Sequence, residues 1–325
     1  MQNRILGKNH LEVSAIGLGC WGMSHAYGMA DEKESLATIN HCLDQGINLL
    51  DTADVYGNGH NESLISKILQ KRRQEAVVAT KFGFIGYETG SVKVNGRPNY
   101  VQKACEQSLL RLNINEIDLY YFHRLDPDVP IEETVGAMAD LCHQGKVRFI
   151  GLSEVSATTL KKASAVHPIT ALQSEYSLWQ RDVEKTILPI CQDLEISLIP
   201  FSPLGRGFLT GTIKSSMDLK ENDYRSNMPR FDPKALKENF TFLKAFQEVA
   251  DKMNISLAQL SLAWLLAQDD SIVPIPGMKQ RKYIDENIKA IDLLLSKQIV
   301  TKLNMMEVSV KGNRYNSKGL AFIDE

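Results

Sequence analysis

The stretch Asn48-Leu-Leu-Asp-Thr-Ala-Asp-Val-Tyr-Gly57 is the part of the chain from which the fold is best inferred. The segment Ile47–Leu50, which starts one residue before this stretch, is apolar except for Asn48 and contains neither Gly nor Pro, which predicts a short buried strand. Asp51 stands where that strand ends, and Tyr56 follows five residues later. Folds of alternating strands and helices place their chemistry at the carboxyl ends of parallel strands, so both are candidate active-site residues. Taken alone, they also fit a helix-capping Asp and a Tyr at a sheet rim.

Composition limits the classes of protein to consider. The chain has 325 residues, 43% of them hydrophobic, and a formal net charge of -2, which indicates a large core and no nucleic-acid or anionic-membrane partner. No apolar run approaches the roughly 20 residues of a membrane span, and the first residues lack the apolar stretch of a signal peptide. The five cysteines and seven histidines are scattered without a metal-binding pattern. We therefore expect a cytoplasmic protein with reduced cysteines and no metal.

Strand-like and helix-like segments alternate eight times along the chain. After a β-hairpin of Arg4–Leu6 and Leu11–Val13, the expected strands are Ala15–Leu18, Ile47–Leu50, Ala76–Thr80, Ile117–Phe122, Val147–Leu152, Thr170–Gln173, Ser197–Phe201 and Ile272–Ile275. Helical periodicity follows each of them, in Glu32–Gln45, Glu62–Gln70, Tyr100–Leu112, Ile131–Gln144, Ala157–Val166, Val183–Leu194, Leu257–Gln268 and Lys282–Ala290. Extra helices are expected at Phe240–Met253 and Ser296–Val308. These units, without a linker, predict an α/β fold: one domain over residues 1–325, folded as a (β/α)8 TIM barrel.

One glycine pattern suggests a different fold. Gly17-Leu-Gly-Cys-Trp-Gly22 matches the Gly-x-Gly-x-x-Gly fingerprint of dinucleotide-binding Rossmann units. In those units the third Gly opens a helix whose N-terminus binds the pyrophosphate. Here no helix is expected before about Asp31, and Trp21 would crowd the phosphate. We therefore do not infer a Rossmann fold from this pattern.

Four side chains are predicted to meet at one end of the barrel. Asp51 and Tyr56 follow the second strand, Lys81 ends the third and His123 ends the fourth. A buried ammonium needs a partner, which Asp51 can provide. The Lys81 cation would lower the pKa of Tyr56 from about 10, and His123 could hydrogen-bond a substrate oxygen. Each residue alone has an ordinary structural explanation, but four at three neighbouring strand ends predict an active site.

These four residues resemble the catalytic tetrad of the aldo-keto reductase superfamily. Other motifs resemble that family along nearly the whole chain: Asp51–Gly57 with Asn61-Glu62, Gly151–Ser153, Gln173–Ser177, Ser202–Gly205, and Ile275–Gly277 with Glu286-Asn287. Gly19-Cys-Trp-Gly-Met-Ser24 and His123-Arg-Leu-Asp-Pro127 resemble the microbial and plant branch that includes pyridoxal and aryl-aldehyde reductases. The resemblance implies an NADP(H)-dependent oxidoreductase that reduces a small aldehyde or ketone to an alcohol. In this reaction Tyr56 would protonate the carbonyl oxygen, Lys81 with Asp51 would tune Tyr56, and His123 would orient the carbonyl.

The resemblance also implies an NADP(H) site. The implied cofactor-binding residues are Cys20, Trp21, Asp51, Ser153, Gln173, Phe201, Ser202, Pro203, Leu204, Gly205, Arg206, Gly207, Gly277, Lys279, Tyr283, Glu286 and Asn287. Phe201 would stack on the nicotinamide, and the backbone of Ser202–Gly207 would line the pyrophosphate. A long loop, Lys214–Asp232, would close over it with Arg225 or Arg230.

One position departs from the family. Where many members carry an Arg for the 2′-phosphate, this chain has Tyr283. Lys279 and Arg281, at the start of the last barrel helix, are alternative phosphate ligands, although they also fit a solvated basic turn.

Two other functions use the same motifs. Potassium-channel β subunits share the expected fold and act as NADP(H)-binding regulatory modules, but they have Asn at the position that matches His123. An aldolase-like barrel could use Lys81 as a Schiff base, although an ion pair with Asp51 would keep it protonated. Substrate specificity would depend on Trp21, on the long loops and on three further residues, His25, Tyr27 and Phe84. The sequence predicts neither the substrate nor the oligomeric state.

Overall fold

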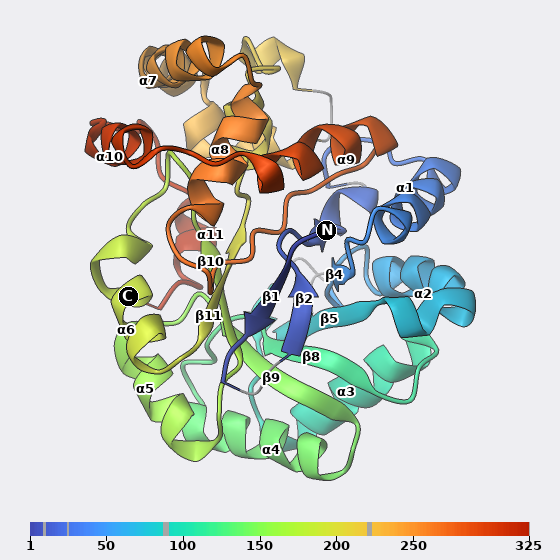
Figure 1. Cartoon of the computed structure of the whole chain (residues 1–325). Helices are drawn as coiled ribbons and strands as arrows, with labels where there is room; N and C mark the ends of the chain where they lie inside the picture. Colours follow the sequence, from blue (N-terminus) through green and yellow to red (C-terminus); the bar gives the residue numbers. More distant parts are fainter. Residues whose placement is uncertain (9–10, 25, 87–90, 220–222, 325) are drawn as a thin grey trace.

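The computed structural model describes residues 1–8, 11–24, 26–86, 91–219 and 223–324 (Figure 1). The predicted pocket residue His25 lies outside the described residues, as do residues 220–222 of the predicted Lys214–Asp232 loop.

A parallel sheet of seven strands forms the wall of the barrel, in the order β11-β10-β9-β8-β5-β4-β3. Its strands are β3 (Leu18–Gly19), β4 (Leu49–Asp51), β5 (Val77–Phe82), β8 (Ile117–Phe122), β9 (Val147–Ser153), β10 (Ala171–Glu175) and β11 (Ser197–Phe201). Figure 1 shows helices surrounding these strands: α1 (Glu32–Asp44), α2 (His60–Arg72), α3 (Pro98–Leu112), α4 (Ile131–His143), α5 (Ala157–Val166), α6 (Val183–Asp193), α8 (Leu257–Leu266) and α9 (Arg281–Asn287). This architecture confirms the predicted (β/α)8 TIM barrel.

The predicted eighth strand, Ile272–Ile275, is replaced by single bridges. Ile272 and Ile275 each bridge to β11, and Gly277 bridges to Gly19 of β3. Pro274 and Pro276 occupy alternate positions here and have no N–H to donate, so a regular ladder cannot form. Backbone hydrogen bonds on both sides of the segment still join β11 to β3 and close the barrel.

The first barrel strand also differs from the prediction. Ala15 and Ile16 form a bend instead of a strand, because the Ser14 hydroxyl donates to the Ile16 carbonyl at 2.8 Å. The predicted hairpin is confirmed as β1 (Asn3–Leu6) and β2 (Leu11–Ser14). Its apolar side chains pack among the interior residues of the barrel and close the amino-terminal end of the strands.

Several helices lie outside the eight-fold repeat. α7 (Pro233–Met253) starts seven residues before the predicted Phe240, because Asp232 caps it and Pro233 occupies its first turn. α10 (Lys297–Met305) and α11 (Ser317–Leu320) follow the barrel, and a small hairpin of β6 (Phe84–Ile85) and β7 (Lys93–Val94) was not predicted. The 3-10 helices are η1 (Trp21–Met23), η2 (Arg73–Glu75), η3 (Gly205–Thr210), η4 (Ser216–Asp218), η5 (Tyr224–Asn227), η6 (Pro229–Phe231) and η7 (Ile288–Asp292).

The chain after α10 crosses the carboxyl ends of the strands, which we call the barrel mouth. Arg314 forms an ion pair with Glu154 at 2.8 Å, and Asp324 accepts a hydrogen bond from the Ser156 N–H at 2.9 Å. The Phe322 ring lies 5.4 Å from the ring of Phe84, measured between centroids. The C-terminal segment therefore forms part of the wall around the predicted active site, which the sequence did not predict.

Candidate active site

The four residues of the predicted tetrad lie together at the barrel mouth. Lys81, which is fully buried, donates to Asp51 Oδ1 at 2.6 Å, to the Thr52 carbonyl at 2.7 Å and to the Tyr56 hydroxyl at 3.2 Å. The ring of His123 lies 6.0 Å from the ring of Tyr56. The strands β4, β5 and β8 are neighbours in the sheet, so their ends bring these side chains into one cluster as the sequence predicted.

The Lys81–Asp51 pair keeps its charges inside the protein. Burial by itself would lower the pKa of Lys81, but Asp51 and Tyr56 together raise that pKa above its ordinary value. Burial raises the pKa of Asp51, and hydrogen bonds from Lys81 and Gln173 oppose this rise. An ammonium with three oxygen acceptors is stable in this environment. Lys81 is therefore a fixed positive charge beside the Tyr56 hydroxyl.

The predicted lowering of the Tyr56 pKa is wrong. Burial raises the pKa of Tyr56 above its ordinary value of 10.0, and the nearby Lys81 cation only offsets part of this rise. The sequence predicted the charge beside Tyr56 but not the burial of its phenol. Tyr56 is therefore a neutral phenol near pH 7, which is the form that can donate a proton.

His123 is neutral and has a free ring nitrogen. Burial, together with the nearby Arg124 and Lys81, holds the pKa of His123 well below 6.5. Its Nδ1 atom is buried and, among the described residues, has no hydrogen-bond partner. Phe84 packs against the ring at 4.9 Å between centroids. A buried nitrogen without a partner is unfavourable unless another molecule supplies one, so it can bind a ligand oxygen.

Four predicted cofactor residues lie next to the tetrad. Gln173 donates to Asp51 Oδ2 at 2.8 Å, and Ser153 accepts from Arg124 at 3.0 Å. The Trp21 ring lies 5.9 Å from the Tyr56 ring, and the N–H of Cys20 donates to the Asp51 carbonyl. The amide of Gln173 and the hydroxyl of Ser153 thus have partners within the chain.

The predicted pyrophosphate loop has an unusual backbone. Ser202, Gly205, Arg206 and Gly207 all have positive φ, at 50°, 56°, 55° and 95°. Gly205 must be glycine for a second reason, because a Cβ atom there would lie 2.8 Å from the indole nitrogen of Trp179. Pro203 is buried and Leu204 partly buried, while Phe201 ends β11 with its side chain partly buried. Successive left-handed residues can turn backbone N–H groups toward an anion.

The predicted adenosine end lies along α9. The Lys279 ammonium donates to the Tyr27 carbonyl at 2.8 Å, and Arg281 forms an ion pair with Glu34 at 3.1 Å. Tyr283 is exposed, whereas Asn287 is buried. Two further predicted residues are placed nearby: Gly277 is exposed and the carbonyl of Glu286 accepts from Gln259.

Sequence reasoning missed part of the mouth. Arg124 directly follows His123 and is buried, so its position after a strand end was a usable signal. Tyr224, Tyr315 and Phe322 come from irregular segments whose pattern gives no sign that they reach the mouth.

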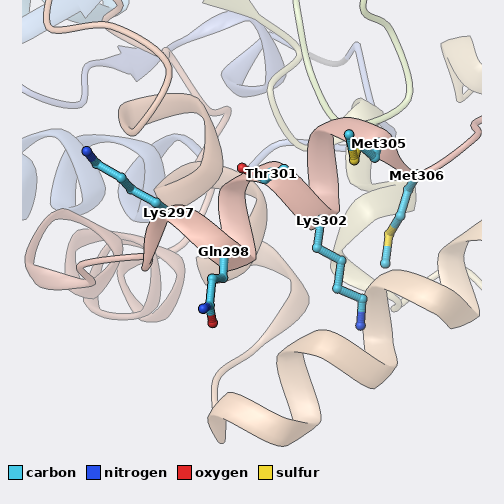
Figure 2. A pocket seen from close by; sticks show the side chains of 6 residues that line it. All are labelled: Lys297, Gln298, Thr301, Lys302, Met305 and Met306. Atoms are coloured by element: carbon cyan, nitrogen blue, oxygen red, sulfur yellow. The ribbon is translucent and has the colours of Figure 1, made fainter.

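Two surface hollows lie away from the tetrad. Figure 2 shows the larger of two, about 590 Å³, lined by side chains of α10 and its end: Lys297, Gln298, Thr301, Lys302, Met305 and Met306. A smaller one of about 270 Å³ lies against η4, η5 and η6. Neither is lined by a tetrad residue, so we do not place the active site there. Across the described parts of the chain, no three His, Cys, Asp or Glu side chains form a metal-binding group. No described helix is both long and apolar enough to cross a membrane.

The barrel and the Asp-Tyr-Lys-His cluster at its mouth agree with the class of barrel that the sequence motifs indicated. Residues 15–307 match the model of the Aldo/keto reductase family. The chain therefore belongs to the aldo-keto reductase family.

Individual relatives extend this finding. The chain is 43% identical to a probable aldo-keto reductase 1 from Glycine max over 300 residues, which cover 90% of this chain and 85% of the relative. It is similar to the glycerol dehydrogenase of Gluconobacter oxydans, with a TM-score of 0.84 and 27% identity over 93% of this chain and 94% of that one. An aldo/keto reductase of Klebsiella pneumoniae, solved with NADP and acetate, shares the fold with a TM-score of 0.73 and 23% identity over 97% and 99% of the two chains.

Proposed function

We propose that this protein uses NADPH to reduce an aldehyde or ketone to an alcohol, with Tyr56 as the proton donor. The observation that carries the proposal is the contact of the Lys81 ammonium with both Asp51 and the Tyr56 hydroxyl. A fixed cation beside a phenol stabilises the phenolate left after the proton is given to the carbonyl oxygen. The pyridine nucleotide, when bound, supplies the hydride.

His123 and the residues around the tetrad support a carbonyl substrate and this cofactor. The Nδ1 atom of His123, which has no hydrogen-bond partner among the described residues, can bind the carbonyl oxygen and so fix the orientation of the substrate. The left-handed run at Gly205–Gly207 suits a pyrophosphate, and Lys279 stands before the N-terminus of α9, where a phosphate is favoured. Phe201, at the end of β11, would pack against the nicotinamide. Family membership supports the same choice.

The alternatives receive less support. A Schiff base requires a neutral lysine, but Asp51 and Tyr56 keep Lys81 protonated. A regulatory NADP(H)-binding module can be distinguished from a reductase by experiment. Such a module would bind NADPH without reducing carbonyl compounds.

The test is NADPH oxidation with aromatic, sugar-derived and pyridoxal-type aldehydes, followed by Tyr56→Phe. This change removes the donated proton and little volume, so turnover should fall by about 10²–10⁴-fold while NADPH still binds. Tyr120→Phe is the matched control, because the Tyr120 hydroxyl is buried without a hydrogen-bond partner in the described structure and its ring stacks on Phe82. Equal activity in Tyr56→Phe and wild type would refute the proposed role. NADPH binding without any turnover would favour the regulatory module.

A further inference from the structure

Two buried carboxylates at the barrel mouth already have cationic partners. Glu154, just beyond β9, pairs with Arg314 at 2.8 Å. Glu175, the last residue of β10, pairs with Arg230 at 3.3 Å and with Arg314 at 3.7 Å. Although burial would raise it, the neighbouring arginines hold the pKa of Glu154 below its ordinary value, so this carboxylate is charged. Both carboxylates thus have a cation within 4.0 Å, although one oxygen of Glu175 has no hydrogen-bond partner among the described residues.

Arg206 is buried at the same mouth without an ion pair. Only 8% of Arg206 is exposed, and no described carboxylate lies within 4.0 Å of its guanidinium. Its two terminal nitrogens donate to the hydroxyls of Tyr27 at 3.2 Å and Tyr315 at 3.1 Å. Its Nε atom is buried and has no hydrogen-bond partner in the described structure. A buried cation in this state is costly, because no carboxylate in direct contact replaces the water it has lost and Glu175 acts on it only from beyond 4.0 Å.

The groups that surround Arg206 are aromatic and neutral. Its guanidinium carbon lies 5.6 Å from the ring centre of Trp21, 5.8 Å from that of Tyr224 and 5.4 Å from that of Tyr315. Burial raises the pKa of Tyr27, and it raises the pKa of Tyr315 to about 12, so both phenols are uncharged near pH 7. The rings therefore hold the guanidinium by weak cation–π contacts and neutral hydrogen bonds.

Arg206 is close to the predicted reaction centre. Trp21 contacts the guanidinium on one side and lies 5.9 Å from the Tyr56 ring on the other. A second buried arginine, Arg124, lies next to the tetrad residue His123, where it donates to the His123 carbonyl and lies over the Phe84 ring at 5.9 Å. Arg124 likewise has no described carboxylate within 4.0 Å of its guanidinium, although it helps to lower the pKa of Glu154, so a second buried cation lies beside the tetrad.

We propose that Arg206 binds an anionic group of the substrate, and that the physiological substrate is a carbonyl compound bearing a carboxylate or a phosphate. This inference rests on the proposed reductase function and names its substrate class. A carboxylate or phosphate would accept from the guanidinium with two parallel hydrogen bonds, in place of the two neutral phenols. The same chemistry could come from a phosphate of the cofactor, so the experiment must separate the two sources.

The first measurement compares matched aldehydes that differ in charge. The pairs are 4-carboxybenzaldehyde with its methyl ester, and 4-formylphenyl phosphate with 4-methoxybenzaldehyde. In wild type, kcat/KM should be about ten- to a hundredfold higher for an anionic member than for its neutral partner. Arg206→Met should remove most of that ratio, and Arg206→Lys should keep part of it. A general loss through the neighbouring backbone loop affects both members equally and cancels in the ratio.

Two controls test whether the preference for anionic aldehydes comes from contact between Arg206 and the substrate. Arg148→Met removes a similar charge near the opposite end of β9, where Asp118 keeps Arg73 as a partner at 2.8 Å, so the ratio should stay at the wild-type value. NADPH dissociation constants are measured for every variant. If Arg206→Met weakens NADPH binding and leaves the ratio of kcat/KM between anionic and neutral aldehydes unchanged, Arg206 binds the cofactor and the inference is wrong.

A binding measurement keeps the inference independent of turnover. Tryptophan fluorescence is titrated with benzoate and with benzamide, its neutral counterpart, and benzoate should bind at least tenfold more tightly in wild type only. If no aldehyde is reduced, the proposed reductase function fails while this result still decides whether Arg206 binds anions. Equal binding of the two compounds, or binding of neither, would then overturn the inference. Where turnover is measurable, a wild-type ratio near one overturns it as well.

Discussion

Lys81 and Arg206 are both cations buried at the barrel mouth, yet their partners differ in kind. Lys81 has a carboxylate, a backbone carbonyl and a phenol within hydrogen-bond distance. Arg206 has two neutral phenols as partners, and its buried Nε has none among the described residues. The charge of Lys81 is balanced by a carboxylate in direct contact, whereas Arg206 has no described carboxylate within 4.0 Å and interacts with Glu175 only from farther away. The difference separates a charge that tunes a neighbouring side chain from one that is available to a ligand.

The backbone points to the same contrast. Lys81 lies in the regular strand β5, but Arg206 has a φ of 55° in the irregular helix η3. A non-glycine residue in the left-handed region costs free energy of order 1 kcal/mol and is most common where function requires it. A buried, unpaired cation on a strained backbone reduces stability, so its presence is best explained by binding.

The largest effect should come from removing each cation in turn. Lys81→Met leaves Asp51 buried without its partner, so the free energy of unfolding should fall by about 3–5 kcal/mol, and reductase turnover should be nearly lost. Arg206→Met leaves no carboxylate unpaired but removes the donor to two partly buried phenols, so the unfolding free energy should fall by only about 1–2 kcal/mol. Urea denaturation measures both. As a control, Lys81→Met with Asp51→Asn should be more stable than Lys81→Met alone. Similar losses in the two single variants would contradict the comparison.

A smaller effect concerns a third cation, Lys279. Its ammonium contacts the Tyr27 carbonyl, and a 2′-phosphate would be a stronger partner than a neutral carbonyl. Lys279→Ala should lower kcat/KM for NADPH about ten- to a hundredfold and leave the value for NADH nearly unchanged. Arg281→Ala is the control, because Arg281 is exposed and already paired with Glu34, so its effect should be smaller. An equal loss with both cofactors in Lys279→Ala would show that this residue does not recognise the phosphate.

Much of the fold could be predicted because each unit carries its own periodic pattern. β8 and β11 were predicted at their observed bounds, and the helix ends were wrong by a few residues at most except in α7. The eighth strand was predicted from its apolar residues, although the alternate prolines Pro274 and Pro276 prevent a regular ladder. The C-terminal segment could not be predicted, since its irregular backbone is placed by contacts with Glu154 and Phe84, far away in the sequence.

The site divides in a similar way. The tetrad was predictable because strand ends of a barrel converge, so Asp51, Lys81 and His123 needed only the right strand assignment. The pKa of Tyr56 was not, because a sequence shows neighbouring charges but not the loss of water around a side chain. The surroundings of Arg206 come from three distant segments that carry Trp21, Tyr224 and Tyr315, and no local pattern links them.

The smallest effect is expected from a change of pH, because neither Lys81 nor Arg206 loses its charge near neutral pH. Tyr56 must be protonated to act as the acid, and its pKa lies above 10.0, so this form persists through neutral pH. His123 is neutral throughout this range as well, because burial holds its pKa well below 6.5. With saturating NADPH, kcat for aldehyde reduction should therefore vary by less than about twofold between pH 6.5 and 9, and fall only as Tyr56 ionises above pH 10. A stopped-flow pH profile measures this, with Tyr120→Phe as control. A fall centred between pH 7 and 8 would mean that Lys81 lowers the Tyr56 pKa after all, and that its charge outweighs burial.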